Sequence, residues 1–438
     1  MRILILHRVP FAYIKYDRVI DHAAHDVVYV GKREALSTIP EGLRCSRVER
    51  AGTGTLAEEV IAIFAPGVEP FDRVISMSQY EVMDAARVRE ALGVQGSTLA
   101  DVLRTDDKVA MKRDVHAKQL RAPRFLPCRE ATIGQAPWEG RTVLKPVDGT
   151  ASRNVHVFAT FAAAQQAIAD GAVPEFDADR FEVEEFLEGP IYHCDGLMLE
   201  GEPLVILASR YVGTCLDYAH GQPLGSVQLP EDSAACAATL RYLDAVGLRS
   251  GPFHLELIET RGATADTAPE FAFLEVAARS GGSDIVELFE LATGIDLVSA
   301  ELAVQIITSP HESDPAMAWL VPRAAEERTR AFGFLIYPGH ALGAAHARIE
   351  GADAFKGHPG IVKWKVLAPG APLATKVSYF DFELPLDVIL TGSTSAEVGA
   401  LIHQILASVR IVPVSDLVPE AISPMVHASG TTSEKVSP

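Results

Sequence analysis

The segment FLEVAARSGG, residues 273–282, decides how we interpret the whole chain. It begins as a short apolar strand, yet it carries Glu275 and Arg279 before it ends on Gly281 and Gly282. A charge in a protein core is costly unless it is paired or bound to an ion. The segment therefore predicts that something charged binds here when the protein works.

The composition limits the class of protein. The chain has 438 residues, and 58 acidic against 39 basic residues give a net charge of −19, which argues against nucleic acid or an anionic membrane as the main partner. The length suits roughly two to three domains. The amino-terminal apolar run is too short for a signal peptide, and no stretch approaches a membrane span. The cysteines form no CxxC pair, which is typical of reduced thiols, so we expect a cytoplasmic protein.

Residues 1–105 alternate short apolar runs with helical patterns. This alternation predicts an amino-terminal parallel α/β domain, with strands at 2–7, 26–31 and 71–77 and helices at 55–65 and 81–92. The segment GTGTLA, residues 52–57, loosely matches a dinucleotide-binding pattern, but it follows a polar stretch rather than a clean strand. We therefore interpret it as a turn that leads into a helix.

The pattern changes at about residue 106. Residues 106–310 combine helices with strands joined by Gly-Pro and Glu-Gly turns, which favours an α+β domain whose first helix has Thr105 or Asp106 as its N-cap. Residues 418–438, rich in Ser, Pro and Thr, predict a disordered tail. Residues 311–417, between this domain and the tail, predict a small, mostly antiparallel β region. Its strands are expected at 331–340, 346–351, 361–370 and 375–384, followed by a helix and a strand within 395–411.

Two lysines stand where a phosphate could bind. Lys108 lies early in a predicted helix, and Lys145 ends the strand VLKP before a loop that contains Gly149 and Ser152. Such a loop offers backbone N–H groups to a phosphate, and a lysine supplies a point charge. The sequence is not a Walker P-loop, because GxxxxGK[ST] is absent. Taken singly, each lysine is also compatible with a solvated surface charge.

The segment VEEFLEG, residues 183–189, interrupts an apolar strand with Glu184 and Glu185. If the edge of this strand is left unpaired, its backbone can bind an adenine through one C=O and one N–H. The alternative is an edge strand whose acids are solvated.

Two predicted neighbouring strands carry one buried acid each, Glu256 in FHLEL and Glu275 in FLEVAA. Two carboxylates on adjacent strands make an oxygen-rich site for Mg²⁺ or Mn²⁺, which phosphoryl transfer requires. Arg279 then lies where it can face a phosphate or carboxylate, and Gly281 and Gly282 allow close backbone approach before a helix. The alternative is a structural ion pair between a glutamate and the arginine.

In this order and at these separations, the four pieces resemble the ATP-grasp superfamily, and more narrowly its carboxylate–amine ligases, such as the L-amino acid ligases. The resemblance covers about residues 100–310. It implies a two-subdomain core that sandwiches ATP, preceded by the parallel domain and followed by the small β region.

The resemblance also implies a role for each matched residue. Lys108 and Lys145 look like the phosphate-contacting lysines, Glu256 and Glu275 like the metal carboxylates, and Arg279 like the arginine that stabilises a phosphorylated intermediate; Arg279 and Lys145 are the implied catalytic pair. The adenine hinge is implied at Glu184, Glu185 and Leu187, the phosphate cover at Ser152, and another phosphate contact at Arg210. The substrate pocket is expected near Tyr211, His220, Arg279, Gly281 and Gly282.

Two positions depart from the superfamily pattern. Ala277 stands where E-x-N-x-R-x-G-G has a metal-binding Asn, and Ile191 stands near the place of an acid that holds the ribose. Ala277 leaves the number of metal ions open, and Glu188 is an alternative ribose contact.

The implied reaction joins a carboxylate to an amine. ATP phosphorylates the carboxylate, the amine attacks the acyl phosphate, and ADP and phosphate are released. The expected substrates are amino acids, and the expected assembly is a homodimer. Two alternatives remain: another ATP-grasp reaction, such as bicarbonate-dependent carboxylation or acid–thiol ligation, or a non-catalytic nucleotide-binding protein, which Ala277 would favour.

Overall fold

The structure is a computed structural model that describes residues 1–64, 69–131, 134–149, 151–264, 267–307, 314–368 and 370–414. The expected disordered tail at 418–438 lies outside these residues, as does Thr150 in the loop after Lys145. Within them, no helix is long and apolar enough to cross a membrane.

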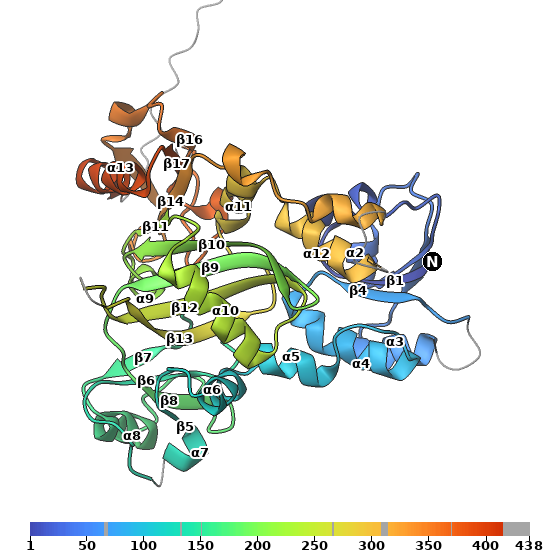
Figure 1. Ribbon diagram of the computed structural model, residues 1–438, viewed down its shortest axis with the longest axis horizontal. Coiled ribbons are helices and arrows are strands. Elements are labelled where there is room, and N and C mark those ends of the chain that lie inside the picture. Colours follow the sequence, from blue (N-terminus) through green and yellow to red (C-terminus); the bar gives the residue numbers. More distant parts are fainter. Residues whose placement is uncertain are drawn as a thin grey trace, which may run out of the picture.

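The amino-terminal strands form a parallel sheet in the order β3-β2-β1-β4, as the alternating pattern predicted. The helices α3 (Leu56–Ile63) and α4 (Val82–Leu92) cover one face of it (Figure 1). The turn reading of residues 52–57 is confirmed, because Thr55 caps α3 and forms a capping box with Glu58. The strands are β1 (Arg2–His7), β2 (Asp26–Gly31), β3 (Ser46–Glu49), which was not predicted, and β4 (Arg73–Ser76).

A small antiparallel sheet follows, in the order β5-β8-β6-β7. It is reached through α5 (Leu99–Asp106) and α6 (Lys108–Ala117), and Figure 1 shows it as a separate lobe below the large sheet. Its own hydrophobic core includes Leu144, Phe181 and Val183. The elements are β5 (Phe125–Pro127), α7 (Cys128–Ala131), β6 (Thr142–Pro146), β7 (His156–Phe158), α8 (Phe161–Ala169) and β8 (Phe181–Glu185).

The largest sheet has eight strands in the order β13-β12-β9-β10-β11-β14-β17-β16, and every pair in it is antiparallel. Its first five strands are β9 (Ile191–Leu199), β10 (Glu202–Val212), β11 (Leu224–Gln228), β12 (Gly251–Arg261) and β13 (Glu270–Ala277), with α9 (Cys215–Ala219) and α10 (Ala234–Val246) between them.

The carboxy-terminal strands are antiparallel as predicted, but three of them extend the large sheet rather than build a sheet of their own. They are β14 (Ala331–Tyr337), β16 (Ile361–Val366) and the unpredicted β17 (Leu386–Gly392), while β15 (His346–Glu350) pairs with β18 (Arg410–Val414) beside α13 (Ser395–Ser408). The strand predicted at 375–384 is wrong, because this segment is a loop with one 3₁₀ turn at Asp381–Glu383.

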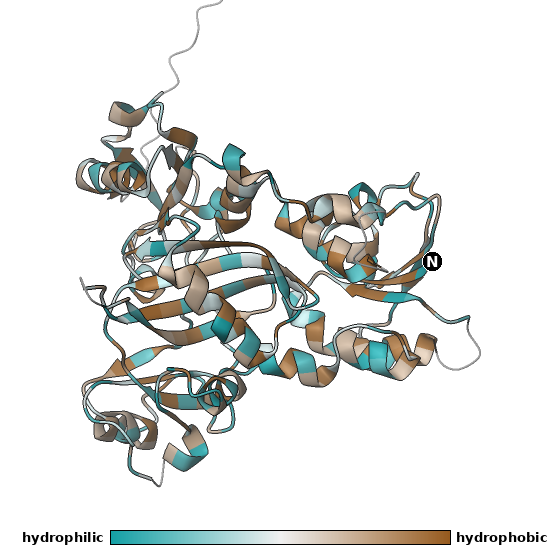
Figure 2. Cartoon of the chain, viewed as in Figure 1, coloured by the Kyte–Doolittle hydropathy of each residue, from teal (hydrophilic) through white to brown (hydrophobic). Residues whose placement is uncertain are grey.

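A continuous apolar core joins the parallel sheet to the large sheet. Ile3 and Ile5 of β1 belong to the same buried cluster as Leu207 of β10, through the helices α11 (Ile285–Thr293) and α12 (Leu297–Ile306). Figure 2 shows hydrophobic residues concentrated along the strands of both sheets. This packing fixes the parallel sheet close to the loop that follows β13.

Candidate active site

A cavity of about 340 Å³ lies between the small sheet and the large sheet. Strands β6, β7 and β8 line one wall, and β12 and β13 line the other. The segments that supply it are up to 167 residues apart in sequence, from 108 to 275, yet they converge here. Of the predicted site residues, eight line the cavity: Lys108, Lys145, Ser152, Glu184, Glu185, Leu187, Glu256 and Glu275.

The two predicted metal carboxylates face each other across neighbouring strands. In the β12–β13 register Glu256 lies directly opposite Glu275, and the next pair is Leu257 with Phe273. Leu274 is therefore an extra residue, a β-bulge in β13. In a regular strand, Phe273 and Glu275 would point to the same face. The bulge instead leaves Phe273 fully buried in the core and turns both Leu274 and Glu275 towards the cavity.

Lys108 reaches this pair of carboxylates from the start of α6. Its Nζ lies 3.1 Å from Glu275 Oε2 and donates to the carbonyl oxygen of Gly149 at 2.6 Å. The helix begins here because the Asp107 side chain accepts hydrogen bonds from the amides of Val109 and Ala110. Neither predicted cap is correct, since Thr105 and Asp106 belong to the preceding helix α5.

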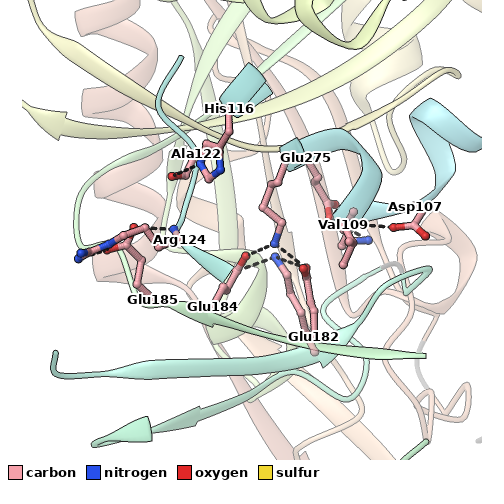
Figure 3. Close-up of polar contacts among 12 residues, drawn as sticks. Asp107, Val109, His116, Ala122, Arg124, Glu182, Glu184, Glu185 and Glu275 are labelled. Carbon is pink, nitrogen blue, oxygen red and sulfur yellow. Dashed lines mark hydrogen bonds and ion pairs between the residues drawn. The ribbon is translucent and has the colours of Figure 1, made fainter. Parts of the chain in front are cut away.

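The opposite wall holds a buried network of four charges. Lys145 Nζ lies 2.7 Å from Glu184 Oε1, and Lys112 Nζ lies 2.6 Å from Glu182 Oε1 and also pairs with Glu184. Figure 3 shows Glu182 and Glu184 projecting from β8 into these ion pairs. All four side chains are 7% exposed or less.

The network sets the charge states of its members. Burial alone would raise the pKa of Glu184, but Lys112 and Lys145 outweigh it and lower that pKa to about 2. Burial would likewise lower the pKa of Lys145, but Glu184 and Glu182 reverse the shift and raise it. Burial dominates at Glu182, whose pKa is raised despite Lys112. Lys145 therefore stays a cation while it lines the cavity.

Sequence reasoning missed Lys112 and Glu182. Lys112 follows Lys108 by four residues, so helical spacing places both lysines on one face of α6. Its ammonium group also lies 4.9 Å from the ring centroid of Phe125. Glu182 alternates with Glu184 on β8, so the two side chains share a face. These two spacings are signals that could have found the network.

The predicted hinge follows β8, but the predicted unpaired strand edge is wrong. β8 pairs with β5 as far as Glu184 and with β6 as far as Glu185. The Glu185 carboxylate is not solvated either, because the guanidinium groups of Arg121 and Arg124 lie 2.7 and 2.9 Å from it. Leu187 lines the cavity just beyond the paired strand. The hinge ends at Gly189, where a Cβ atom would lie 2.0 Å from the carbonyl oxygen of Glu259.

The loop between β6 and β7 has an unusual backbone. Ala151, Ser152 and Asn154 adopt positive φ values of 57°, 51° and 56°. Residues with a Cβ atom pay roughly 1–2 kcal/mol for the left-handed conformation. Ser152 lines the cavity from this strained loop, which is the place where the phosphate cover was predicted.

Glu256 ends a row of hydrogen-bonded groups that the sequence did not reveal. Tyr211 Oη donates to Glu256 Oε1 at 3.2 Å, and His254 Nε2 lies 3.6 Å from the same oxygen. The carboxylate of Asp195 contacts His254 Nδ1 at 2.8 Å and His193 Nδ1 at 2.6 Å. Burial would lower the pKa of His254, but Asp195 and Glu256 raise it to about 10. The imidazolium therefore balances Glu256.

The remaining predicted residues do not line the cavity. Tyr211 contacts Glu256, which lines the cavity, but does not line the cavity itself. Arg210 is exposed on the opposite face of β10, because side chains alternate along a strand. His220 is exposed at the end of α9. Arg279 donates to the carbonyl oxygen of Ser280 in its own loop.

The two glycines after Arg279 differ in their surroundings. A Cβ atom on Gly281 would lie 2.9 Å from both Asp195 Oδ1 and His254 Nδ1, so only glycine fits against this pair. Gly282 has open space at the same position. The predicted close approach is therefore specific to Gly281.

Known proteins share this architecture. No family model matches the chain. An L-arginine-specific L-amino acid ligase of Bacillus subtilis is 23% identical over 256 residues, which covers 56% of this chain and 60% of that protein. The alignment thus spans less than two thirds of the relative's length.

Solved structures match almost the whole chain. An L-amino acid ligase from Bacillus licheniformis gives a TM-score of 0.61 at 18% identity and covers 94% of this chain and 98% of its own. The chain has the ATP-grasp fold. A phosphoribosylglycinamide synthetase from Anaerococcus prevotii gives 0.57 at 13% identity, with 94% and 99% covered. An N5-carboxyaminoimidazole ribonucleotide synthetase from Thermotoga maritima gives 0.56 at 9% identity, again with 94% and 99% covered.

The ATP-grasp fold confirms the predicted class, a parallel α/β sheet combined with antiparallel α+β sheets. The structure also places Ala277 and Ile191, the two residues that depart from the superfamily pattern. Ala277 pairs with His254 in the strand register, two residues along each strand from the pair Glu256 and Glu275. Its methyl group offers no ligand atom. Ile191 and Glu188 both line the cavity beside the hinge.

Proposed function

We propose that the protein is an ATP-dependent carboxylate–amine ligase that forms an amide bond and releases ADP and phosphate. One observation carries the proposal: Glu256 and Glu275 lie opposite each other in the cavity that Lys108 and Lys145 also line. Like charges directly opposite on two strands destabilise a sheet unless a cation lies between them. Two lysines and two carboxylates around one cavity suit a nucleotide whose phosphates carry a divalent ion.

The donor set fits Mg²⁺ or Mn²⁺. Both ions prefer carboxylate oxygens, and Glu256 and Glu275 supply them from a rigid pair of strands. Lys108 lies 3.1 Å from Glu275 and lowers the pKa of that carboxyl group, and the His254 imidazolium lies 3.6 Å from Glu256. A bound ion supplies charge neutralisation between the nucleotide phosphates when it is present.

The chain's own residues then position the reactants. Lys145, held as a cation by Glu184, is a fixed positive charge for the phosphates, and the backbone after Glu185 is the proposed adenine contact. A carboxylate oxygen attacks the γ-phosphorus of ATP and ADP leaves; the amine nitrogen then attacks the acyl carbon and phosphate leaves. Arg279 is the proposed contact of the acyl phosphate, once its loop turns towards the cavity.

The proposed substrates are amino acids. The matched relatives include proteins named L-amino acid ligase, which supports this class without naming the pair of substrates. Tyr211 and His220 belong to residues 211–226, the segment that we propose lines the pocket for the second substrate. We also propose a cytoplasmic homodimer; the five cysteines are all free, in keeping with a reducing compartment.

The test is an ADP-release assay with Mg²⁺-ATP and every L-amino acid, singly and in pairs. The proposal predicts ADP and phosphate release that requires both an acid and an amine, with a dipeptide or amide detected by mass spectrometry. Release of AMP contradicts it. Turnover that depends on bicarbonate or coenzyme A without any amine identifies the other ATP-grasp chemistry. ATP binding with no turnover across the panel identifies a non-catalytic protein.

A further inference from the structure

A second cavity, of about 500 Å³, lies beside the edge of the parallel sheet. It is bordered by β4 and α4 on one side, by α12 on the other, and by the turn at 247–252 before β12. None of the residues that line this second cavity also lines the first cavity, between the small and the large sheet. The two cavities are neighbours, because the same two segments reach both. Lys108 and Glu275 line the first cavity, while Thr105 and Ala278, three residues away from each, line the second.

Arg89 lines this cavity with a buried positive charge. The residue is 9% exposed, and its guanidinium donates to the carbonyl oxygen of Val74 at 3.0 Å and, at 3.4 Å, to those of Ser97 and of the Gln305 side chain. These partners are all uncharged. Within the described residues no carboxylate pairs with Arg89, and burial lowers its pKa to about 10. A buried cation without a counter-ion is costly unless an anion joins it.

Glu301 supplies the opposite charge in the same cavity. Burial raises its pKa to about 7, which Arg279 opposes, and across the described part of the chain its carboxyl group makes no hydrogen bond or ion pair. Glu301 and Gln305 lie four residues apart on α12, so both are on one face of the helix, with Cβ atoms about 5–6 Å apart. Gln305 in turn contacts Arg89. The Arg89 guanidinium and the Glu301 carboxyl group therefore stand at the two ends of one short row.

We propose that this second cavity binds a free α-amino acid, with the ligand carboxylate on Arg89 and the ligand ammonium group on Glu301. A zwitterion of this size pairs with the buried Arg89 and the half-buried Glu301 at once, whereas a simple anion or a simple amine leaves one of them without a charged partner. Val82, Val102 and Val304 line the walls and provide apolar contact for a side chain. The site needs neither nucleotide nor metal, so it stands independently of the proposed ligase activity.

Isothermal titration calorimetry tests the site with the whole, nucleotide-free protein in EDTA and each L-amino acid as the probe. We expect at least one amino acid to bind. Its N-acetyl derivative, which lacks the ammonium group, and its amide, which lacks the carboxylate, are each expected to bind about tenfold to a hundredfold more weakly. Glu301→Gln, which preserves side-chain shape, is expected to weaken binding of the amino acid by the same factor. In this variant the N-acetyl derivative should bind as tightly as the free amino acid.

Two further variants keep the proposal falsifiable. Arg89→Gln is expected to lose the preference for the free carboxylate, and Glu301→Gln reports on the site even if Arg89→Gln does not fold. Glu290→Gln, an exposed change of equal charge on α11, should bind as the unchanged protein does. No binding by any amino acid, or binding that Glu301→Gln leaves unchanged, overturns the proposal, whatever the result of the ADP-release assay.

Discussion

The two walls of the cavity between the small and the large sheet pair their charges differently. On the wall formed by β6 and β8, Lys112, Lys145, Glu182 and Glu184 neutralise one another and are almost inaccessible to solvent. On the wall formed by β12 and β13, two carboxylates face each other, and the side chain of Glu275 is 32% exposed.

This difference indicates that the two walls have different tasks. The first wall is complete without a ligand, so its charges contribute to stability and hold Lys145 in place. The second wall has like charges in register, and the proposed metal ion would complete it. Substitutions on the first wall should therefore affect folding first, and those on the second should affect turnover first.

The strongest test of the first wall is Lys112→Met. It leaves Glu182 and Glu184 buried with one cation fewer, and breaking a buried ion pair by removing one partner costs about 3–5 kcal/mol. We expect a loss of that size in the free energy of unfolding, measured by urea titration. The double variant Lys112→Met with Glu182→Leu should recover most of it, because no unpaired charge remains.

Lys118→Met is the matched control, since Lys118 follows the same helix and is 56% exposed in its side chain. It should change the free energy of unfolding by less than about 0.5 kcal/mol. Equal effects of the two lysine variants would show that the buried network does not carry stability.

Glu275→Gln tests the second wall. It removes one of two facing carboxylates, so we expect turnover to fall by about a hundredfold to a thousandfold, the loss typical of a group that stabilises transition-state charge. The free energy of unfolding should fall by less than for Lys112→Met, because the lost ion pair with Lys108 is partly offset by relief of the repulsion with Glu256. Steady-state ADP release and urea unfolding of the same protein measure both.

Glu270→Gln lies on the same strand but is exposed and pairs with Arg261 at the surface. It should leave turnover within about twofold, since surface pairs contribute little. If Glu275→Gln unfolds the protein while retaining turnover, the assignment of tasks to the two walls is wrong.

The contrast also explains what the sequence could and could not predict. Alternating apolar runs predicted three of the four strands of the parallel sheet, though not β3, and isolated acids in apolar strands identified Glu256 and Glu275. The bulge at Leu274 was not predictable, because strand periodicity alone places Glu275 on the face of Phe273. The spacings of Lys112 and Glu182 indicate which face each side chain shares with a neighbour, but that the two residues pair with each other depends on tertiary packing that local patterns do not encode.

Loop conformations were the other feature that the sequence did not predict. The motif Arg279 to Gly282 was recognisable, but only the folded chain shows that Gly281 packs against Asp195 and His254. Segment 375–384 was predicted as a strand yet forms a loop, in which Val377 and Tyr379 pack against the apolar core without pairing to a strand.

The pH dependence of stability tests the charge pairing of the first wall. The folded state lowers the pKa of Glu184 to about 2 from 4.5, so its ion pairs stabilise the protein above pH 4.5 and are lost as the pH falls towards 2. The loss amounts to at most about 3 kcal/mol, at 1.36 kcal/mol per unit. We expect Glu184→Gln to show a flatter decline in the free energy of unfolding between pH 5 and pH 3. An unchanged decline contradicts the assignment; Glu202→Gln, at an exposed position, is the control.

The smallest expected effect concerns Ala277, beside the second wall. Ala277→Asn restores the oxygen ligand that the superfamily pattern has there, and a further ligand should lower the Mg²⁺ concentration for half-maximal turnover by about threefold to tenfold. Ala277→Val adds similar bulk without a ligand atom and should not lower it. Titration of ADP release with MgCl₂ distinguishes the two variants. If both shift the midpoint equally, bulk rather than coordination is responsible, and the second wall binds its cation without help from position 277.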